Sequence, residues 1–146
     1  MHIKQTRDTM SDIYFDALRI RNTVFVKEQG VPYELEMENP VEEAEAVHFV
    51  GYIDGTAVGT VRLLADSEGK TALVQRMAIL KEERGKGYAH YLIDALLAFA
   101  KEAKLSELVL HAQVTARGLY DKFDFIAEGE VFEEAGIDHI TMRKIL

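Results

Sequence analysis

The sequence predicts a mixed α/β fold in which helices pack on a central β-sheet. Two stretches, residues 11–27 and 87–103, repeat apolar residues at helical spacing. Between them, residues 48–64 form two β-rich runs around Asp54-Gly55, a strong local signal for a hairpin. Further strand patterns follow the second helix, so the chain alternates strands and helices. This order predicts a mixed sheet with helices packed on it.

The N-terminal part of the chain is expected to form a strand and then a helix. Residues 2–6 are predicted to form a short first strand. The first helix has Ser11 or Asp12 as its N-cap, and Gly30 and Pro32 end it because both residues break regular structure. After these breaks the sequence becomes acidic.

The acidic stretch ELEMENPVEEAEA, residues 34–46, is expected to be a loop. Its carboxylates could attract a cationic ligand, but a solvated loop is the commoner reason for such a run. The glutamates in question are Glu34, Glu36, Glu38, Glu42, Glu43 and Glu45.

The remaining elements follow the hairpin around Asp54-Gly55. A second hairpin has its turn at residues 66–70 and leads into the apolar strand TALVQRMAIL. The predicted elements after the helix 87–103 are a strand at Glu107–Ala112, a short helix at Ala116–Phe123, and strands near Ile126–Phe132 and His139–Ile145 around the turn Glu134-Ala135-Gly136.

Composition limits the class of protein. The 146 residues, without repeats or linkers, are expected to form one domain, 1–146. There is no cysteine, which excludes disulfides, thiolate catalysis and cysteine-ligated metals. The net charge of -8 argues against nucleic acid as a partner, because phosphate binding needs a broad basic surface. No apolar signal region or membrane-length run is present, so a cytoplasmic location without a membrane partner is expected.

A glycine-rich basic loop precedes the second helix. Residues 82–89 read EERGKGYA, with two cations and two glycines in an otherwise acidic chain. A helix N-terminus leaves N–H groups unpaired and carries the positive end of the helix dipole. Glycine allows a phosphate to approach these groups, and Arg84 and Lys86 would add charge, so the loop is a candidate anion cradle. A tight helix entry with solvated cations explains the same pattern. The loop matches neither GxxxxGK[ST] nor GxGxxG.

Several segments resemble the GNAT superfamily of N-acetyltransferases, particularly its small bacterial single-domain members. Arg84-x-x-Gly87-x-Ala89 fits the superfamily's Q/R-x-x-G-x-G/A signature, and the order of elements fits its fold. The runs VFVKEQGVP, HAQVTARGLYDKFDF and EEAGIDHITM are similar to its first-helix region, its fifth-strand region and its C-terminal end. Two positions depart from the pattern: Asp124 replaces the glycine of a G-F pair, and Gln113 stands where many relatives carry asparagine. Asp tolerates left-handed backbone, so the turn at Asp124 is expected to persist.

The resemblance implies a GNAT fold with about six to seven strands, helices on both faces of the sheet, and a site for acetyl-CoA. Backbone N–H groups of the loop would hold its diphosphate, and the splayed strand before the loop would pair with its pantetheine arm. The implied cofactor-binding residues are Met77, Ala78, Ile79, Arg84, Gly85, Lys86, Gly87, Tyr88, Ala89, Gln113 and Tyr120. An ordinary core strand also explains residues 77–79. No metal is implied.

Acyl transfer to an amine needs a base for the amine, a donor that polarises the carbonyl and an acid for the thiolate. By resemblance Tyr120 is the acid, and an amide of Met77 or Ile79 polarises the carbonyl; a packing role is the alternative for Tyr120. Glu28 and His139 are predicted as catalytic bases. The wider set of base candidates is Glu28, His48, His111, Glu130, Glu134 and His139, for each of which a structural role is the alternative.

The expected activity is therefore acetyl-CoA-dependent N-acetylation of a primary amine on a small molecule or a protein. Three alternatives remain open at this point: a transferase that uses a longer acyl-CoA, a non-catalytic acyl-CoA sensor or interaction module, and a loop that binds nucleotide phosphates. Pairing through exposed C-terminal strands would give a homodimer.

Overall fold

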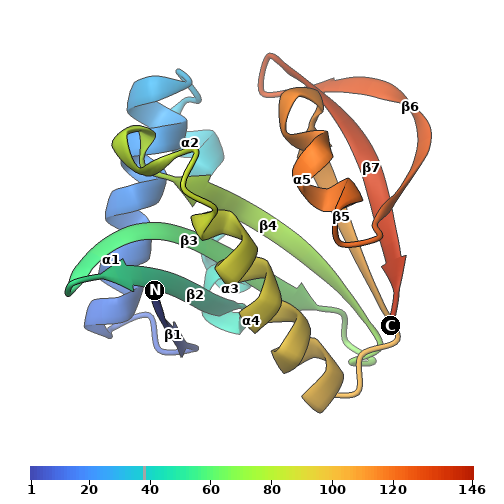
Figure 1. Ribbon diagram of the computed structural model, residues 1–146, viewed down its shortest axis with the longest axis horizontal. Coiled ribbons are helices and arrows are strands. Elements are labelled where there is room, and N and C mark those ends of the chain that lie inside the picture. Colours follow the sequence, from blue (N-terminus) through green and yellow to red (C-terminus); the bar gives the residue numbers. More distant parts are fainter. Residues whose placement is uncertain (38) are drawn as a thin grey trace.

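The computed structural model describes residues 1–37 and 39–146 and contains one seven-stranded sheet in the order β1-β2-β3-β4-β5-β7-β6 (Figure 1). Neighbouring strands are antiparallel except β4 and β5, which are parallel. The sequence-based prediction of a mixed sheet is confirmed. The strands are β1 (His2–Thr6), β2 (Val47–Ile53), β3 (Thr56–Ala65), β4 (Thr71–Ile79), β5 (Glu107–Gln113), β6 (Ile126–Glu134) and β7 (Ile137–Ile145).

Two long helical segments cover opposite faces of the sheet (Figure 1). On one face lies α1 (Asp12–Arg21), capped by Ser11, whose hydroxyl accepts from the Tyr14 N–H at 3.3 Å. It continues as a wider π-helical stretch, η1 (Asn22–Glu28). On the other face, α4 (Tyr88–Glu102) buries one apolar stripe, and each buried leucine or isoleucine contributes roughly 1.5–3 kcal/mol. The residues of that stripe are Leu92, Ile93, Leu96 and Ala100.

The turns follow from the local sequence. Asp54 and Gly55 both have positive φ, 49° and 80°, as a two-residue hairpin turn matching the twist of β2 and β3 requires. The last hairpin turns through Ala135 and Gly136 at φ 54° and 77°. Asp124 has φ 66°, which confirms that it maintains a left-handed turn in place of glycine. Before it, the segment predicted at 116–123 forms a 3₁₀ turn, η3 (Val114–Ala116), and α5 (Arg117–Asp121).

The acidic stretch is not a loop, so this prediction was wrong. It contains α2 (Tyr33–Glu36) and α3 (Pro40–Glu45). Asn39 caps α3 by accepting from the Glu42 N–H at 3.1 Å, and proline at the first helical position fits a helix start. Acidic residues in a first helical turn are also favourable. Of the acidic run, only Glu38 lies outside the described residues.

The feature that positions the site is the divergence of β4 from β5. The two strands pair only from Thr71–Val74 to Glu107–Leu110, and β5 then stays with β7 as far as the pair Gln113–His139. A register shift between β3 and β4 accompanies the divergence, with Arg76 at φ 59°. Such a bulge bends a strand and re-aims its side chains. None of the helices in the described part of the chain has the length and apolar character needed to span a membrane.

Candidate active site

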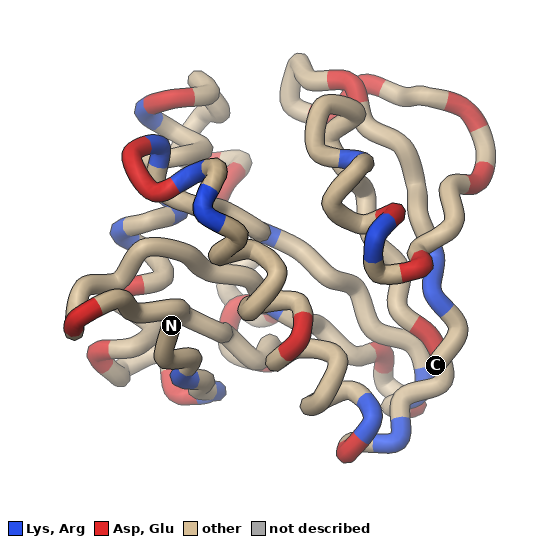
Figure 2. Tube along the Cα trace, in the orientation of Figure 1, with Lys and Arg blue, Asp and Glu red and all other residues tan. Residues whose placement is uncertain are grey.

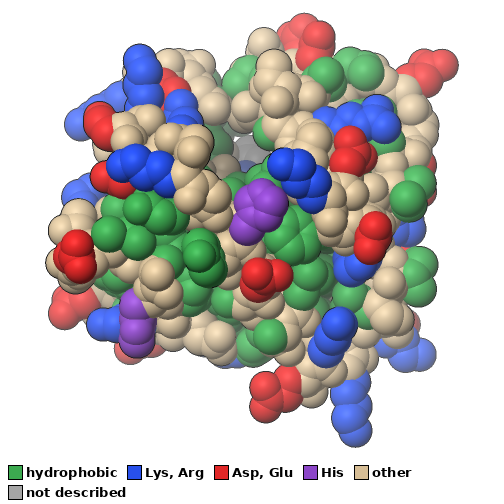
Figure 3. Space-filling model, viewed as in Figure 1, with side chains coloured by type: hydrophobic (Ala, Val, Ile, Leu, Met, Phe, Trp, Pro, Cys, Tyr) green, Lys and Arg blue, Asp and Glu red, His purple; other side chains and the backbone are tan. Residues whose placement is uncertain are grey.

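The diverging ends of β4 and β5 enclose a cavity of about 590 Å³, the β4–β5 cleft. In Figure 3 the surface is hollowed between the halves of the molecule that carry β1–β4 and β5–β7. Ten of the residues predicted from the sequence line this cleft, although they come from four separate segments of the chain. They are Met77, Ala78, Ile79, Arg84, Ala89, His111, Gln113, Tyr120, Glu134 and His139.

The glycine-rich loop presents free backbone donors at the start of α4. In the described part of the chain, the N–H groups of residues 85–89 donate to no acceptor. Gly85 and Gly87 have φ 78° and 80°, and a Cβ at either position would meet nothing within 4 Å. Unpaired N–H groups, open space and the N-terminus of a 15-residue helix together suit an anionic group.

The cations of this loop are paired with carboxylates, and Figure 2 shows acidic and basic residues next to one another along the chain before α4. Arg84 forms a bidentate pair with Glu28 at 2.6 and 2.8 Å, and its Nε donates to the Ile79 carbonyl at 2.9 Å. The hydrogen bond between them raises the pKa of Arg84 and lowers that of Glu28. Lys86 lies 3.0 Å from Glu83. Arg84 therefore ties the loop to the end of β4, and the free donors of the cradle are backbone groups.

The end of β4 offers a backbone donor toward the cleft. Leu80 donates its N–H to Val58 of β3 at 2.9 Å. Successive residues of a strand direct their backbone groups to opposite sides, so the N–H and carbonyl of Ile79 point away from β3 toward the open side. The carbonyl binds Arg84, whereas the N–H stays available.

Tyr120 stands on α5 with its ring buried at 6% exposure and packed edge-on against Phe125. Among the described residues its hydroxyl makes no hydrogen bond, and no fully buried side-chain oxygen there lacks a partner, so the hydroxyl oxygen is not fully buried. The hydroxyl is therefore open to the cleft that Tyr120 lines. Burial raises the pKa of Tyr120, so the phenol stays protonated at neutral pH.

Three of the base candidates meet on one wall of the cleft. Glu134 lies between two histidines, with its Oε1 3.6 Å from His111 Nδ1 and its Oε2 3.9 Å from His139 Nε2. His139 Nδ1 lies 2.7 Å from the Ile137 carbonyl oxygen, so this nitrogen carries the proton and donates it. The other ring nitrogen, Nε2, is the one that lies near Glu134. Phe132 stacks on His139 and fixes the plane of the ring.

The other three candidates lie elsewhere. Glu28 does not line the cleft, because Arg84 holds its carboxylate at the outer end of η1. His48 is buried in β2 with Nε2 2.9 Å from the Glu43 carbonyl, and burial together with Arg21 lowers its pKa to about 4. Glu130 is exposed on β6 away from the cleft. His48 is a structural residue.

Gln113, the second of the two departures from the family pattern, pairs with Gln29 at the end of η1. The two amides exchange hydrogen bonds of 3.0 and 3.5 Å across the cleft, over 84 residues of sequence. The Gln113 side chain therefore links the two walls of the cleft directly, and no local sequence pattern pointed to Gln29 as its partner.

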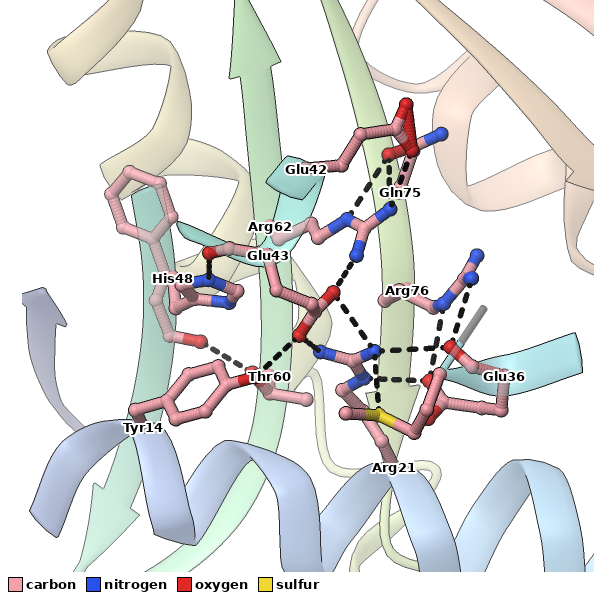
Figure 4. A network of polar contacts seen from close by, with 12 residues as sticks. Tyr14, Arg21, Glu36, Glu42, Glu43, His48, Thr60, Arg62, Gln75 and Arg76 are labelled. Atoms are coloured by element: carbon pink, nitrogen blue, oxygen red, sulfur yellow. Dashed lines mark hydrogen bonds and ion pairs between the residues drawn. The ribbon is translucent and has the colours of Figure 1, made fainter. Parts of the chain in front are cut away.

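A buried network of charges beneath the cleft was not predicted (Figure 4). Glu36 and Glu43, expected to be solvated, are 5% and 4% exposed. Arg21 binds both carboxylates at 2.7 Å, Arg62 binds Glu43, and Arg76 binds Glu36 at 3.1 Å. These contacts hold α2 and α3 against β3 and β4. Buried charges persist in proteins when they are paired in this way.

Comparisons with known proteins agree with this geometry. The profile of the acetyltransferase (GNAT) domain matches residues 13–146. YjcF of Bacillus subtilis (strain 168), named an uncharacterized N-acetyltransferase, is 35% identical over 131 residues, which are 88% of this chain and 90% of YjcF. An acyl-CoA N-acyltransferase from Pseudomonas aeruginosa has a crystal structure that matches with a TM-score of 0.82 and 27% identity over 98% of this chain and 99% of that chain. An aminoglycoside 6′-N-acetyltransferase complexed with coenzyme A shares the fold, with a TM-score of 0.73 and 14% identity over 99% of this chain and 97% of that chain.

The fold and the cleft are those of a GNAT-type acyltransferase. The chain belongs to the GNAT acetyltransferase family, as its sequence motifs predicted. In residues 1–37 and 39–146, no group of three or more His, Asp or Glu side chains is arranged to hold a metal ion.

Proposed function

We propose that the protein is an acetyl-CoA-dependent N-acetyltransferase that transfers the acetyl group to a primary amine of a small molecule or a protein. The observation that carries this proposal is the meeting, in one cleft, of a phenol and a histidine–carboxylate pair beside a loop of free backbone N–H groups. The family supports an acyl-CoA donor, since its members transfer acyl groups.

The residues fit the two ends of acetyl-CoA. The free N–H groups of residues 85–89 would bind the diphosphate, and the helix dipole of α4 would add favourable potential. The Ile79 N–H, directed to the open side of β4, would pair with the pantetheine arm or polarise the thioester carbonyl. Arg84 would act indirectly by fixing the loop through Ile79 and Glu28.

Two proton transfers remain for the side chains. His139 Nε2, assisted by Glu134, would take a proton from the ammonium form of the acceptor, because only the neutral amine has a lone pair for attack. The amine nitrogen then bonds to the carbonyl carbon and, as the carbon–sulfur bond breaks, loses its second proton to solvent; His139 likewise releases its proton to solvent. The Tyr120 hydroxyl would protonate the departing thiolate, which is costly to leave charged beside a buried ring. Solvent returns the proton to Tyr120.

The test is release of free CoA thiol from acetyl-CoA in the presence of a panel of amines. We expect release from the wild type and a loss of turnover of about 100-fold or more in Tyr120→Phe, with acetyl-CoA binding retained. Tyr91→Phe removes the same hydroxyl from an exposed position on α4 and should turn over normally. Binding without thiol release for every amine would make the protein a sensor; normal turnover by Tyr120→Phe would make Tyr120 a packing residue.

A further inference from the structure

Gln75 and Arg76 of β4 line the cleft, and we call this part of its lining the floor. The orientation of the Gln75 amide is fixed by Arg62. Its Oε1 accepts from Arg62 Nε at 3.0 Å and from Arg62 Nη2 at 2.8 Å. A guanidinium has donors only, so the amide oxygen has to face Arg62 and the NH₂ group has to point away from it. Within the described chain that NH₂ group donates to no acceptor, and Gln75 lines the cleft.

Arg76 presents a second unused donor at the same floor. It sits in the bulge of β4 at φ 59°, where the backbone re-aims its side chain. Nε and Nη2 donate to Glu36 at 3.1 and 3.2 Å, whereas Nη1 has no acceptor among the described residues. With 27% of its side chain exposed, Arg76 lines the cleft.

The floor carries an excess of positive charge although the chain as a whole is acidic. Arg21, Arg62 and Arg76 face two buried carboxylates (Figure 4). Among the described residues, the one further carboxylate within 4 Å of these guanidinium groups is that of Glu42, which is 3.9 Å from Arg62 and 38% exposed. Burial together with the positive charges of Arg76 and Arg21 lowers the pKa of Arg62 to about 10. The facing carboxylate of Glu36 is already bound by two guanidinium groups.

We propose that the acceptor is a small amine that also carries a carboxylate, bound by the Gln75 amide and the free Nη1 of Arg76. The histidine–carboxylate wall, formed by Glu134 and His139, faces the amino group of the same molecule. This inference rests on the proposed function, because it names the substrate class of that site. On the floor, Gln75 and Arg76 offer donors that have no acceptor among the described residues. On the wall, Glu134 and His139 offer acceptors. An amine without a carboxylate would leave the donors of the floor unpaired, which disfavours its binding.

The first test compares amino acids, with the amino group α or ω to the carboxylate, against their primary amides. The amide replaces the carboxylate by a neutral group of similar size. It also makes the amine less basic, so intrinsic reactivity favours the amide and a preference for the acid has to come from binding. By CoA thiol release we expect kcat/KM for the best acid to exceed that for its amide by about 10–100-fold.

The second test is Gln75→Glu. A glutamate oxygen still accepts from Arg62, so the contact that orients the side chain is kept, while the two donors are replaced by a negative charge. The ratio of kcat/KM for acid over amide should fall by about 10-fold or more, mainly through KM of the acid. Gln5→Glu makes the same change at an exposed position on β1 and should keep the wild-type ratio. Arg76→Gln is the second variant, used if Gln75→Glu does not fold.

The possible outcomes distinguish failure of the carboxylate site from failure of the proposed N-acetyltransferase function. If amides or other neutral amines release thiol as well as the acids do, the N-acetyltransferase stands and the carboxylate site is refuted. An unchanged acid-to-amide ratio in Gln75→Glu or Arg76→Gln also refutes it. If no amine of either kind releases thiol, the proposed function fails and the inference fails with it.

Discussion

Replacing Glu43 by glutamine should destabilise the protein far more than the same change at its neighbour Glu42. The buried carboxylate of Glu43 accepts from Tyr14 Oη at 2.7 Å, from Arg21 Nη1 at 2.7 Å and from Arg62 Nη1. A glutamine has one acceptor oxygen, and its NH₂ group would face a guanidinium that also only donates. The variant leaves two guanidinium groups buried without their shared anion.

Breaking a buried pair in this way costs about 3–5 kcal/mol of unfolding free energy. For a chain of this length the loss corresponds to a fall in Tm of roughly 6–20 °C. Glu42 is 38% exposed and 3.9 Å from Arg62, so Glu42→Gln should cost less than about 1 kcal/mol. The two substitutions are chemically identical and one residue apart, which makes burial the variable.

Urea denaturation followed by circular dichroism measures both variants against the wild type. We expect a lower midpoint for Glu43→Gln with an unchanged m-value, because the surface exposed on unfolding stays the same. Equal destabilisation of the two variants, or none in Glu43→Gln, would refute the buried network.

Two further predictions concern the cradle and a buried histidine. Gly87→Ala should lose most of the stabilisation, about 2.7 kcal/mol, that acetyl-CoA at a hundred times its Kd gives in thermal melts. Gly55→Ala, also at φ 80° with open surroundings, introduces the same backbone strain but should keep the stabilisation by acetyl-CoA. Equal ligand-induced shifts in the two variants would refute diphosphate binding by the loop. Burial lowers the pKa of His48 to about 4 in the native protein, whereas it is about 6.5 in the unfolded chain. As the pH falls between these two values only the unfolded chain binds the proton, so the free energy of unfolding decreases by on the order of 3 kcal/mol. His48→Gln should flatten this fall in pH-dependent urea melts, and parallel curves for the two proteins would contradict it.

The sequence was informative where local chemistry decides the structure. The turn at Asp54-Gly55, the cap at Ser11 and the loop before α4 each depend on residues close together in the chain, and all three form as expected. Tyr120 was placed at the cleft by a family pattern, and the structure does bring it there.

The sequence was misleading where long-range contacts decide. Glu36 and Glu43 read as part of a solvated acidic run, yet their partners lie 15 to 40 residues away and bury them. Likewise, His111, Glu134 and His139 were separate candidates, because only the β5–β7 pairing and the final hairpin bring them to one wall. Hydrophobic periodicity and local propensity do not report contacts between residues that are distant in the sequence.

The buried network links the stability of the fold to the chemistry of the cleft. Arg62 donates from Nη1 to Glu43 and from Nε and Nη2 to Gln75, so the carboxylate on α3 fixes the guanidinium that in turn fixes the amide on the cleft floor. Glu36 does the same for Arg76 from α2. The acidic run therefore contributes two anions that orient Arg62 and Arg76 beside the cleft. Although the net charge of the chain is -8, three guanidinium groups lie beside two buried carboxylates at this floor, because the position of a charge relative to the sheet, and not composition, decides which charges a ligand meets.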